Sequence, residues 1–210
     1  MPRRRASVTA PRKTPKQARS ARLVEAILQA AVRVLERDGA AAFTTIRVAE
    51  RAGVSVGSLY QYFPNKESIL FRLQRDEWEA TGRLLDGILS DERRGAAERL
   101  RAAMRAFFRT ELDEAPLRRA LSDAAPLYRD APETRAQRER GVARLRALVG
   151  EAAPELPPRR RGFAADLYVA LLGSMGKHVS EIARSRAEVD TWSAAVADMF
   201  LAYVRDPGEG

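Results

Sequence analysis

The sequence contains no cysteine and only one histidine, His178. Without cysteine the chain can build neither a disulfide framework nor a thiolate metal site. The histidine has no second histidine beside it, and the sequence has no nucleophile elbow, phosphate-binding loop or dinucleotide-binding fingerprint. These absences predict a protein that is not an enzyme and that has no catalytic residues, no metal site and no cofactor.

Long uncharged apolar segments are also missing. The most apolar stretch, residues 163–175, is interrupted by Asp166 and is too short to span a bilayer. The N-terminus is basic, but no apolar signal-peptide core follows it. With 45% hydrophobic and 31% charged residues over a length of 210, the chain is expected to be a cytoplasmic globular protein with no membrane partner.

Positive charge is concentrated at one end of the chain. Residues 1–66 hold 13 Lys and Arg against 4 Asp and Glu, whereas residues 67–210 hold 24 of each kind. The formal net charge of +9 therefore belongs to the first third of the sequence. This polarity is typical of a polyanion-binding unit attached to a neutral one.

Residues 43–66 have the pattern of two short helices, a tight turn and the start of a third helix: FTTIRVAERAGVSVGSLYQYFPNK. Thr45 is predicted to cap the first helix, and Gly53 to end it in the left-handed conformation that glycine adopts without strain. Ser55 is predicted to cap the second helix, and Asn65 to cap the third after a proline break. The inward faces are predicted to consist of Ile46, Val48, Ala49 and Ala52 on the first helix and of Leu59 and Phe63 on the second.

The second of these helices has an outward face suited to DNA, because it carries hydroxyl, amide and small apolar groups. The candidates for contacts with base edges are Ser58, Gln61 and Val56, with Gly57 allowing a close approach of the backbone. The candidates for phosphate contacts are Tyr60, Tyr62 and Lys66. The alternative is a helical hairpin that only packs within the protein and leaves these polar side chains in solvent.

The run L-Y-x-Y-F-x-N-K, here from Leu59 to Lys66, resembles the DNA-binding domain of the tetracycline-repressor (TetR) family. The resemblance is strong from about residue 18 to residue 70 and beyond that concerns architecture only. It implies a phosphate contact from Thr45 and operator contacts from Ser55, Val56, Gly57, Ser58, Tyr60, Gln61, Tyr62 and Lys66. The sequence departs from the family pattern at Arg47, where an acidic residue would suit the start of a helix better.

Helical periodicity in the rest of the chain predicts an all-α fold. Residues 1–14 form a basic arm that is expected to be disordered in isolation, and that either enters the minor groove or only adds charge. Residues 15–66 are assigned to a three-helix, helix-turn-helix DNA-binding domain, and residues 67–210 to a helical ligand-binding and dimerisation domain. Helices in this second domain are expected over residues 65–90, 96–112, 132–152 and 160–184, with a last one capped by Asp190.

Two sets of side chains in the second domain are candidates for further sites. A small-molecule pocket is predicted to involve Trp78, Phe107, Phe108, Leu112, Tyr128, Phe163, Tyr168 and Met175, each of which can equally belong to a packed core. Small and apolar residues on the last two helices favour a four-helix interface in a two-fold dimer, made by Leu171, Ser174, Met175, Val196, Met199, Phe200 and Tyr203. The alternative is a monomer with two ordinary core helices, but pairing would supply the avidity that one half-site lacks.

These patterns together predict a ligand-responsive transcriptional regulator. It is expected to be a repressor that binds a palindromic double-stranded DNA operator as a homodimer and is released by a small hydrophobic molecule. The helix that begins near Asn65 would couple the ligand pocket to the DNA-binding domain. The alternative is a DNA-binding module without small-molecule control, either partner-controlled or architectural.

Overall fold

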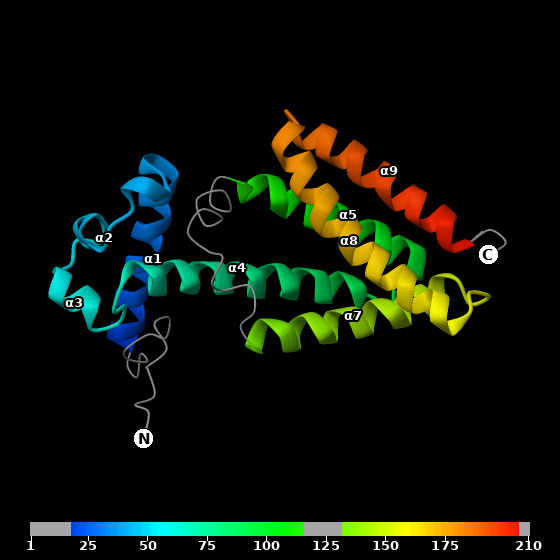
Figure 1. The fold of residues 1–210 in the computed structure, drawn as a ribbon, viewed down its shortest axis with the longest axis horizontal. Helices are drawn as coiled ribbons and strands as arrows, with labels where there is room; N and C mark the ends of the chain where they lie inside the picture. Colours follow the sequence, from blue (N-terminus) through cyan, green and yellow to red (C-terminus); the bar gives the residue numbers. More distant parts are fainter. Residues whose placement is uncertain (1–17, 116–131, 206–210) are drawn as a thin grey trace, which may run out of the picture. The chain divides into compact units, whose positions relative to one another are not determined.

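A computed structural model describes residues 18–115 and 132–205, and Figure 1 shows that these residues form helices joined by short connections. The expected all-α fold is confirmed, since the described ranges contain no strand. The predicted basic arm and Tyr128 lie outside these ranges. The described chain divides into an N-terminal unit, residues 18–77, and a C-terminal unit, residues 78–115 and 132–205, each with its own apolar core.

The N-terminal unit contains four helical segments before its last helix. They are α1 (Ala18–Asp38), the short 3-10 helix η1 (Ala40–Ala42), α2 (Thr45–Ala52) and α3 (Val56–Tyr60). Helix α2 packs against both α1 and α3. Their shared core is formed by fully buried apolar side chains, the largest being Ile27, Phe43, Leu59, Phe63 and Ile69.

Helix α4 (Lys66–Leu89) begins in the N-terminal unit and ends in the C-terminal one. The predicted cap is confirmed, because the Asn65 Oδ1 atom accepts a hydrogen bond of 2.8 Å from the Ser68 amide. At the other end, the buried Arg99 donates from Nη1 to the Leu89 carbonyl at 3.1 Å and also pairs with Glu151. The last carbonyls of a helix have no partner within it, so this guanidinium stabilises the end of α4.

The C-terminal unit continues with α5 (Ala96–Asp113), α7 (Pro132–Ala152), α8 (Pro158–Ile182) and α9 (Arg186–Arg205). Helix α5 packs against α7, α8 and α9 (Figure 1). Three ion pairs join α5 to α9, namely Arg101–Asp198, Arg109–Asp190 and Asp113–Arg186. Because the numbers rise along α5 as they fall along α9, the pairs show that these two helices run antiparallel.

The start of α9 corrects the sequence interpretation. The sequence predicts Asp190 as the cap of this helix, but the helix begins at Arg186. The Ser185 Oγ atom accepts a hydrogen bond of 3.2 Å from the Glu188 amide, and the Glu188 carboxylate accepts one of 2.7 Å from the Arg184 amide. Asp190 lies one turn further on and pairs with Arg109 instead, which holds the pKa of the Asp190 carboxyl below its usual range.

Candidate DNA-binding surface

The first helix of the helix-turn-helix, α2, is capped by Thr44. The Thr44 backbone is extended and its hydroxyl accepts a hydrogen bond of 3.2 Å from the Arg47 amide. The prediction that Thr45 is the cap is therefore wrong, because Thr45 already lies within the helix. Instead, the Thr45 hydroxyl lies 3.1 Å from the Tyr60 hydroxyl, so that it joins the start of α2 to the end of α3.

The corner between α2 and α3 is made by Gly53. Its φ of 66° and ψ of 31° are left-handed, as predicted, and its amide donates to carbonyls at the end of α2. Two residues later, the Ser55 hydroxyl accepts a hydrogen bond of 3.1 Å from the Ser58 amide, which confirms Ser55 as the cap of α3. The turn therefore ends one helix and starts the next within a few residues.

Helix α3 presents a polar surface and buries one apolar side. Leu59 within the helix and Phe63 just after it are almost completely buried, as predicted. Ser55, Gly57, Tyr60 and Gln61 are exposed, and so is Lys66 at the start of α4. Val56 and Ser58 are half-buried; Val56 packs against the core, and the Ser58 hydroxyl lies 2.8 Å from that of Ser55.

Tyr62 does not belong to this surface. Its side chain is only 5% exposed, and its hydroxyl donates a hydrogen bond of 3.1 Å to the Ser20 Oγ atom on α1. The prediction that Tyr62 points outward is wrong because the chain stays helical just beyond α3: Gln61 has right-handed helical angles, and the Phe63 amide donates to the Leu59 carbonyl at 2.9 Å. Tyr62 therefore lies one turn after the buried Leu59, on the same inward side. Tyr62 holds α1 against the turn that follows α3.

Replacing Tyr62 with phenylalanine tests this structural role. The variant should lose about 1 kcal/mol of stability, because one partly buried hydrogen bond is removed. Its affinity for DNA should stay within about twofold of the wild type, and the dependence of that affinity on salt should not change. Thermal unfolding and a titration of DNA binding at several salt concentrations measure both effects; a clear loss of affinity at unchanged stability would instead identify a contact with DNA.

Ile46 belongs to the exposed side of α2, although the sequence predicts that it faces inward. Its side chain is 56% exposed, whereas Thr45, Val48 and Ala49 are buried. The inward side of this helix is therefore centred on Thr45, and Ile46 is the next residue around the helix. Ile46 therefore adds an apolar side chain to the exposed surface of α2.

The candidate pocket residues of the C-terminal unit fall into three groups. Phe108 and Tyr168 are fully buried members of its apolar core, whereas Phe163 is 61% exposed. The half-buried members are Trp78, Phe107, Leu112 and Met175. A pocket at this place would therefore be lined by the half-buried group, with Phe108 and Tyr168 supporting it from the core.

The candidate dimer residues also differ in how far they are exposed. Val196 and Phe200 are buried within their own chain, at 4% and 1% exposure, so they cannot form the surface of an interface. Met199 is 58% exposed, Ser174 is exposed, and Leu171, Met175 and Tyr203 are half-buried. His178 is also exposed on α8.

Within the described ranges, no group of three or more His, Asp or Glu side chains is arranged to hold a metal ion. Among the same residues, no helix combines the length and the apolar character needed to cross a membrane.

A capped pair of short helices with an exposed polar second helix defines the class of helix-turn-helix DNA-binding proteins.

Comparison with known proteins gives the family. The model of the family described as "Bacterial regulatory proteins, tetR family" matches residues 27–73 of the chain. The model of the family described as "Tetracyclin repressor-like, C-terminal domain" matches residues 95–206. The chain belongs to the TetR family of DNA-binding transcriptional regulators. The nucleoid occlusion factor SlmA of Vibrio campbellii is a relative with 30% identity over 165 residues, which cover 74% of this chain and 83% of the relative.

Solved structures share the fold at lower identity. A putative TetR-family transcriptional regulator from Mesorhizobium loti has a TM-score of 0.67 and 21% identity, with 89% of this chain and 98% of that chain covered. The fatty acid degradation regulator FadR from Bacillus halodurans has a TM-score of 0.62 and 23% identity, with 90% and 97% covered.

Proposed function

We propose that this regulator represses transcription by binding a palindromic operator as a homodimer. The observation that supports the proposal is the surface of α3, where Ser55, Tyr60 and Gln61 are exposed on a helix fixed to a buried core. In a helix-turn-helix protein, the second helix enters the major groove and its exposed side chains contact base edges. Hydroxyl and amide groups of this kind hydrogen-bond bases, and the exposed Lys66 would contact a phosphate.

The dimer would form through the exposed sides of α8 and α9. Ser174 and Met199 provide small and apolar surface there, and Leu171, Met175 and Tyr203 are half-buried on the same two helices. Large apolar side chains left in solvent on neighbouring helices favour association of two copies. Two N-terminal units held in this way would bind two half-sites of the same duplex.

A small hydrophobic effector would act through α4. This helix is capped by Asn65 in the N-terminal unit, and its last carbonyl is held by Arg99 in the C-terminal unit. An effector bound beside Trp78 would release the operator if it stabilised the form of the dimer whose two DNA-binding surfaces are wrongly spaced. The half-buried Phe107, Leu112 and Met175 offer an apolar lining for it.

Selection of bound sequences from random DNA tests operator recognition. The wild-type chain should enrich a palindrome. The Gln61→Ala and Ser58→Ala variants should fold normally and should change the preferred bases, each by about 1–3 kcal/mol at the affected base pair. If Gln61→Ala left both the enriched motif and the affinity unchanged, the proposed recognition surface would be wrong.

A second function is favoured by the relative from Vibrio campbellii, a nucleoid occlusion factor of which this chain covers 83%. In that case the chain would be a DNA-binding module without small-molecule control, either partner-controlled or architectural. Mapping of bound sites in cells, together with a thermal-shift and operator-release screen of hydrophobic molecules, separates the two. A few promoter sites and a releasing molecule support the repressor; dispersed sites and no releasing molecule support the alternative.

A further inference from the structure

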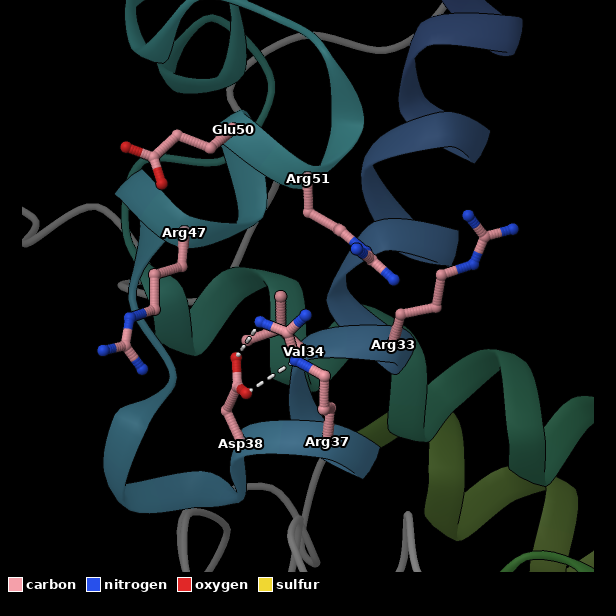
Figure 2. Close-up of a pocket in the computed structure, with 7 residues that line it drawn as sticks. All are labelled: Arg33, Val34, Arg37, Asp38, Arg47, Glu50 and Arg51. Carbon is pink, nitrogen blue, oxygen red and sulfur yellow. Dashed lines mark hydrogen bonds and ion pairs between the residues drawn. The ribbon is translucent and has the colours of Figure 1, made fainter.

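A cleft of about 410 Å³ opens on the N-terminal unit between the second half of α1 and the exposed side of α2. We call it the arginine cleft, and Figure 2 shows the residues that line it: Arg33, Val34, Arg37, Asp38, Arg47, Glu50 and Arg51. Four of the seven Lys and Arg residues between positions 18 and 66 lie here. These four guanidinium groups therefore share one concave place outside α3 with two carboxylates, Asp38 and Glu50.

One of the arginines is already paired. Arg37 donates to both carboxylate oxygens of the neighbouring Asp38, from Nε to Oδ1 at 2.9 Å and from Nη2 to Oδ2 at 3.4 Å. This hydrogen bond is the main cause that holds the pKa of the Asp38 carboxyl below its usual range, and the charges of Arg37, Arg47 and Arg51 add to it. Guanidinium groups from two helices therefore act on one point of the cleft.

Two of the arginines are not paired. Among the residues that the structure describes, neither Arg33 nor Arg51 makes a hydrogen bond or an ion pair. Both side chains are exposed, and Figure 2 shows Arg51 extending from α2 toward α1, which carries Arg33. With Asp38 occupied by Arg37, two guanidinium groups remain free to bind an anion, and their planar geometry suits a phosphate.

The position of α2 identifies the anion. In helix-turn-helix proteins the first helix crosses the DNA backbone while the second lies in the groove. Here α2 is the first helix; it packs against α3 on one side and forms the arginine cleft with α1 on the other. An acidic protein segment would match the charge as well. A DNA duplex bound by α3 would, however, have its backbone beside α2, so DNA is the polyanion that this position favours.

We infer that the arginine cleft binds phosphates of the DNA backbone beside the groove that receives α3, with Arg33 and Arg51 as the contacting side chains. The inference rests on the proposed placement of α3 in the major groove, and it adds a contact made by side chains of α1 and α2, outside α3. Such a contact contributes affinity without sequence preference, because phosphates are common to all sequences.

The test uses the full-length chain with Arg33→Gln and Arg51→Gln combined. Its affinity should fall on the order of tenfold for selected and random DNA alike, and the slope of log affinity against log salt should fall by about 0.9 for each phosphate that the variant no longer binds. The double variant Arg159→Gln and Arg184→Gln is the matched control, since it removes the same charge from exposed positions of the C-terminal unit. The Arg33→Lys and Arg51→Lys pair should keep most of the affinity.

Neutral methylphosphonate groups, introduced at one DNA phosphate at a time, locate the contact. Positions that weaken the wild type but not the glutamine variant are the phosphates held by the cleft. Unchanged affinity and salt slope in a folded glutamine variant would overturn the inference, and so would a loss confined to one sequence. Failure of the proposed repressor function would give a different result. The wild type would then enrich no palindrome, even if its affinity for random DNA depended on the cleft.

Discussion

Replacement of Gly53 by valine is expected to reduce operator affinity at least about thirtyfold and to lower the stability of the N-terminal unit. Gly53 has a φ of 66°, which costs an ordinary L-residue up to about 2 kcal/mol and is worse for a β-branched one. A side chain added there would meet no atom within 4 Å, so the cost is purely one of backbone conformation. Relief of that strain rotates α3 away from α2, and 2 kcal/mol corresponds to a factor of about thirty in affinity.

Asparagine at the same position is the matched control, because it tolerates the left-handed conformation better than other non-glycine residues. The Gly53→Asn variant should bind DNA within about fivefold of the wild type and should unfold close to the wild-type temperature. Circular dichroism melts and fluorescence anisotropy with operator DNA measure both quantities. Equal behaviour of the valine and asparagine variants would show that the corner does not control the position of α3.

The features of the helix-turn-helix that follow from local chemistry could be predicted from the sequence. Gly53, Ser55 and Asn65 act as expected because a left-handed glycine or a capping side chain needs only its neighbours in sequence. The error at Thr44 and Thr45 has a local cause as well, since two adjacent threonines offer the same hydroxyl. Only the backbone conformation decides which one caps the helix.

Features that depend on how helices pack could not be predicted in the same way. A tyrosine after a short helix can point to solvent or return to the core, and Tyr62 returns to the core, where its hydroxyl donates a hydrogen bond to Ser20, far away in sequence. Likewise, Phe200 and Met199 are both large and apolar on α9, but Phe200 is buried against the Tyr168 ring, whereas Met199 is 58% exposed. The periodicity of apolar residues in a sequence predicts which side of a helix is apolar. It does not predict whether the same chain or a second copy covers that side.

The arginine cleft is a further case of this kind. The sequence places an excess of positive charge in the first third of the chain, which predicts a polyanion but not a site. Arg33 and Arg51 come from different helices, and their shared cleft exists only because α2 folds back against α1. Charge counts along a sequence therefore predict the class of partner, and the packing of helices predicts which side chains meet it.

The second large effect is expected at Tyr168, a candidate pocket residue. Its side chain extends from α8 and is fully buried against α5 and α9. Its ring meets the Phe200 ring edge-on, with 5.0 Å between the ring centroids, and its hydroxyl donates a hydrogen bond of 2.7 Å to the Leu100 carbonyl. Burial raises the pKa of the phenol, so it remains a protonated donor at any ordinary pH. These contacts are those of a core side chain.

The Tyr168→Ala variant should therefore lose about 3–5 kcal/mol of stability, because it removes a large buried ring and leaves a cavity. That is a large part of the roughly 5–15 kcal/mol that is usual for a folded protein, and its melting temperature should fall by on the order of 10 °C. The Tyr168→Phe variant keeps the ring and should lose only about 1 kcal/mol, the worth of the hydrogen bond to Leu100. Suppose instead that Tyr168→Ala unfolded at the wild-type temperature and its affinity for an effector changed. Tyr168 would then line a ligand pocket, and α5, α8 and α9 would enclose that pocket rather than a dry core.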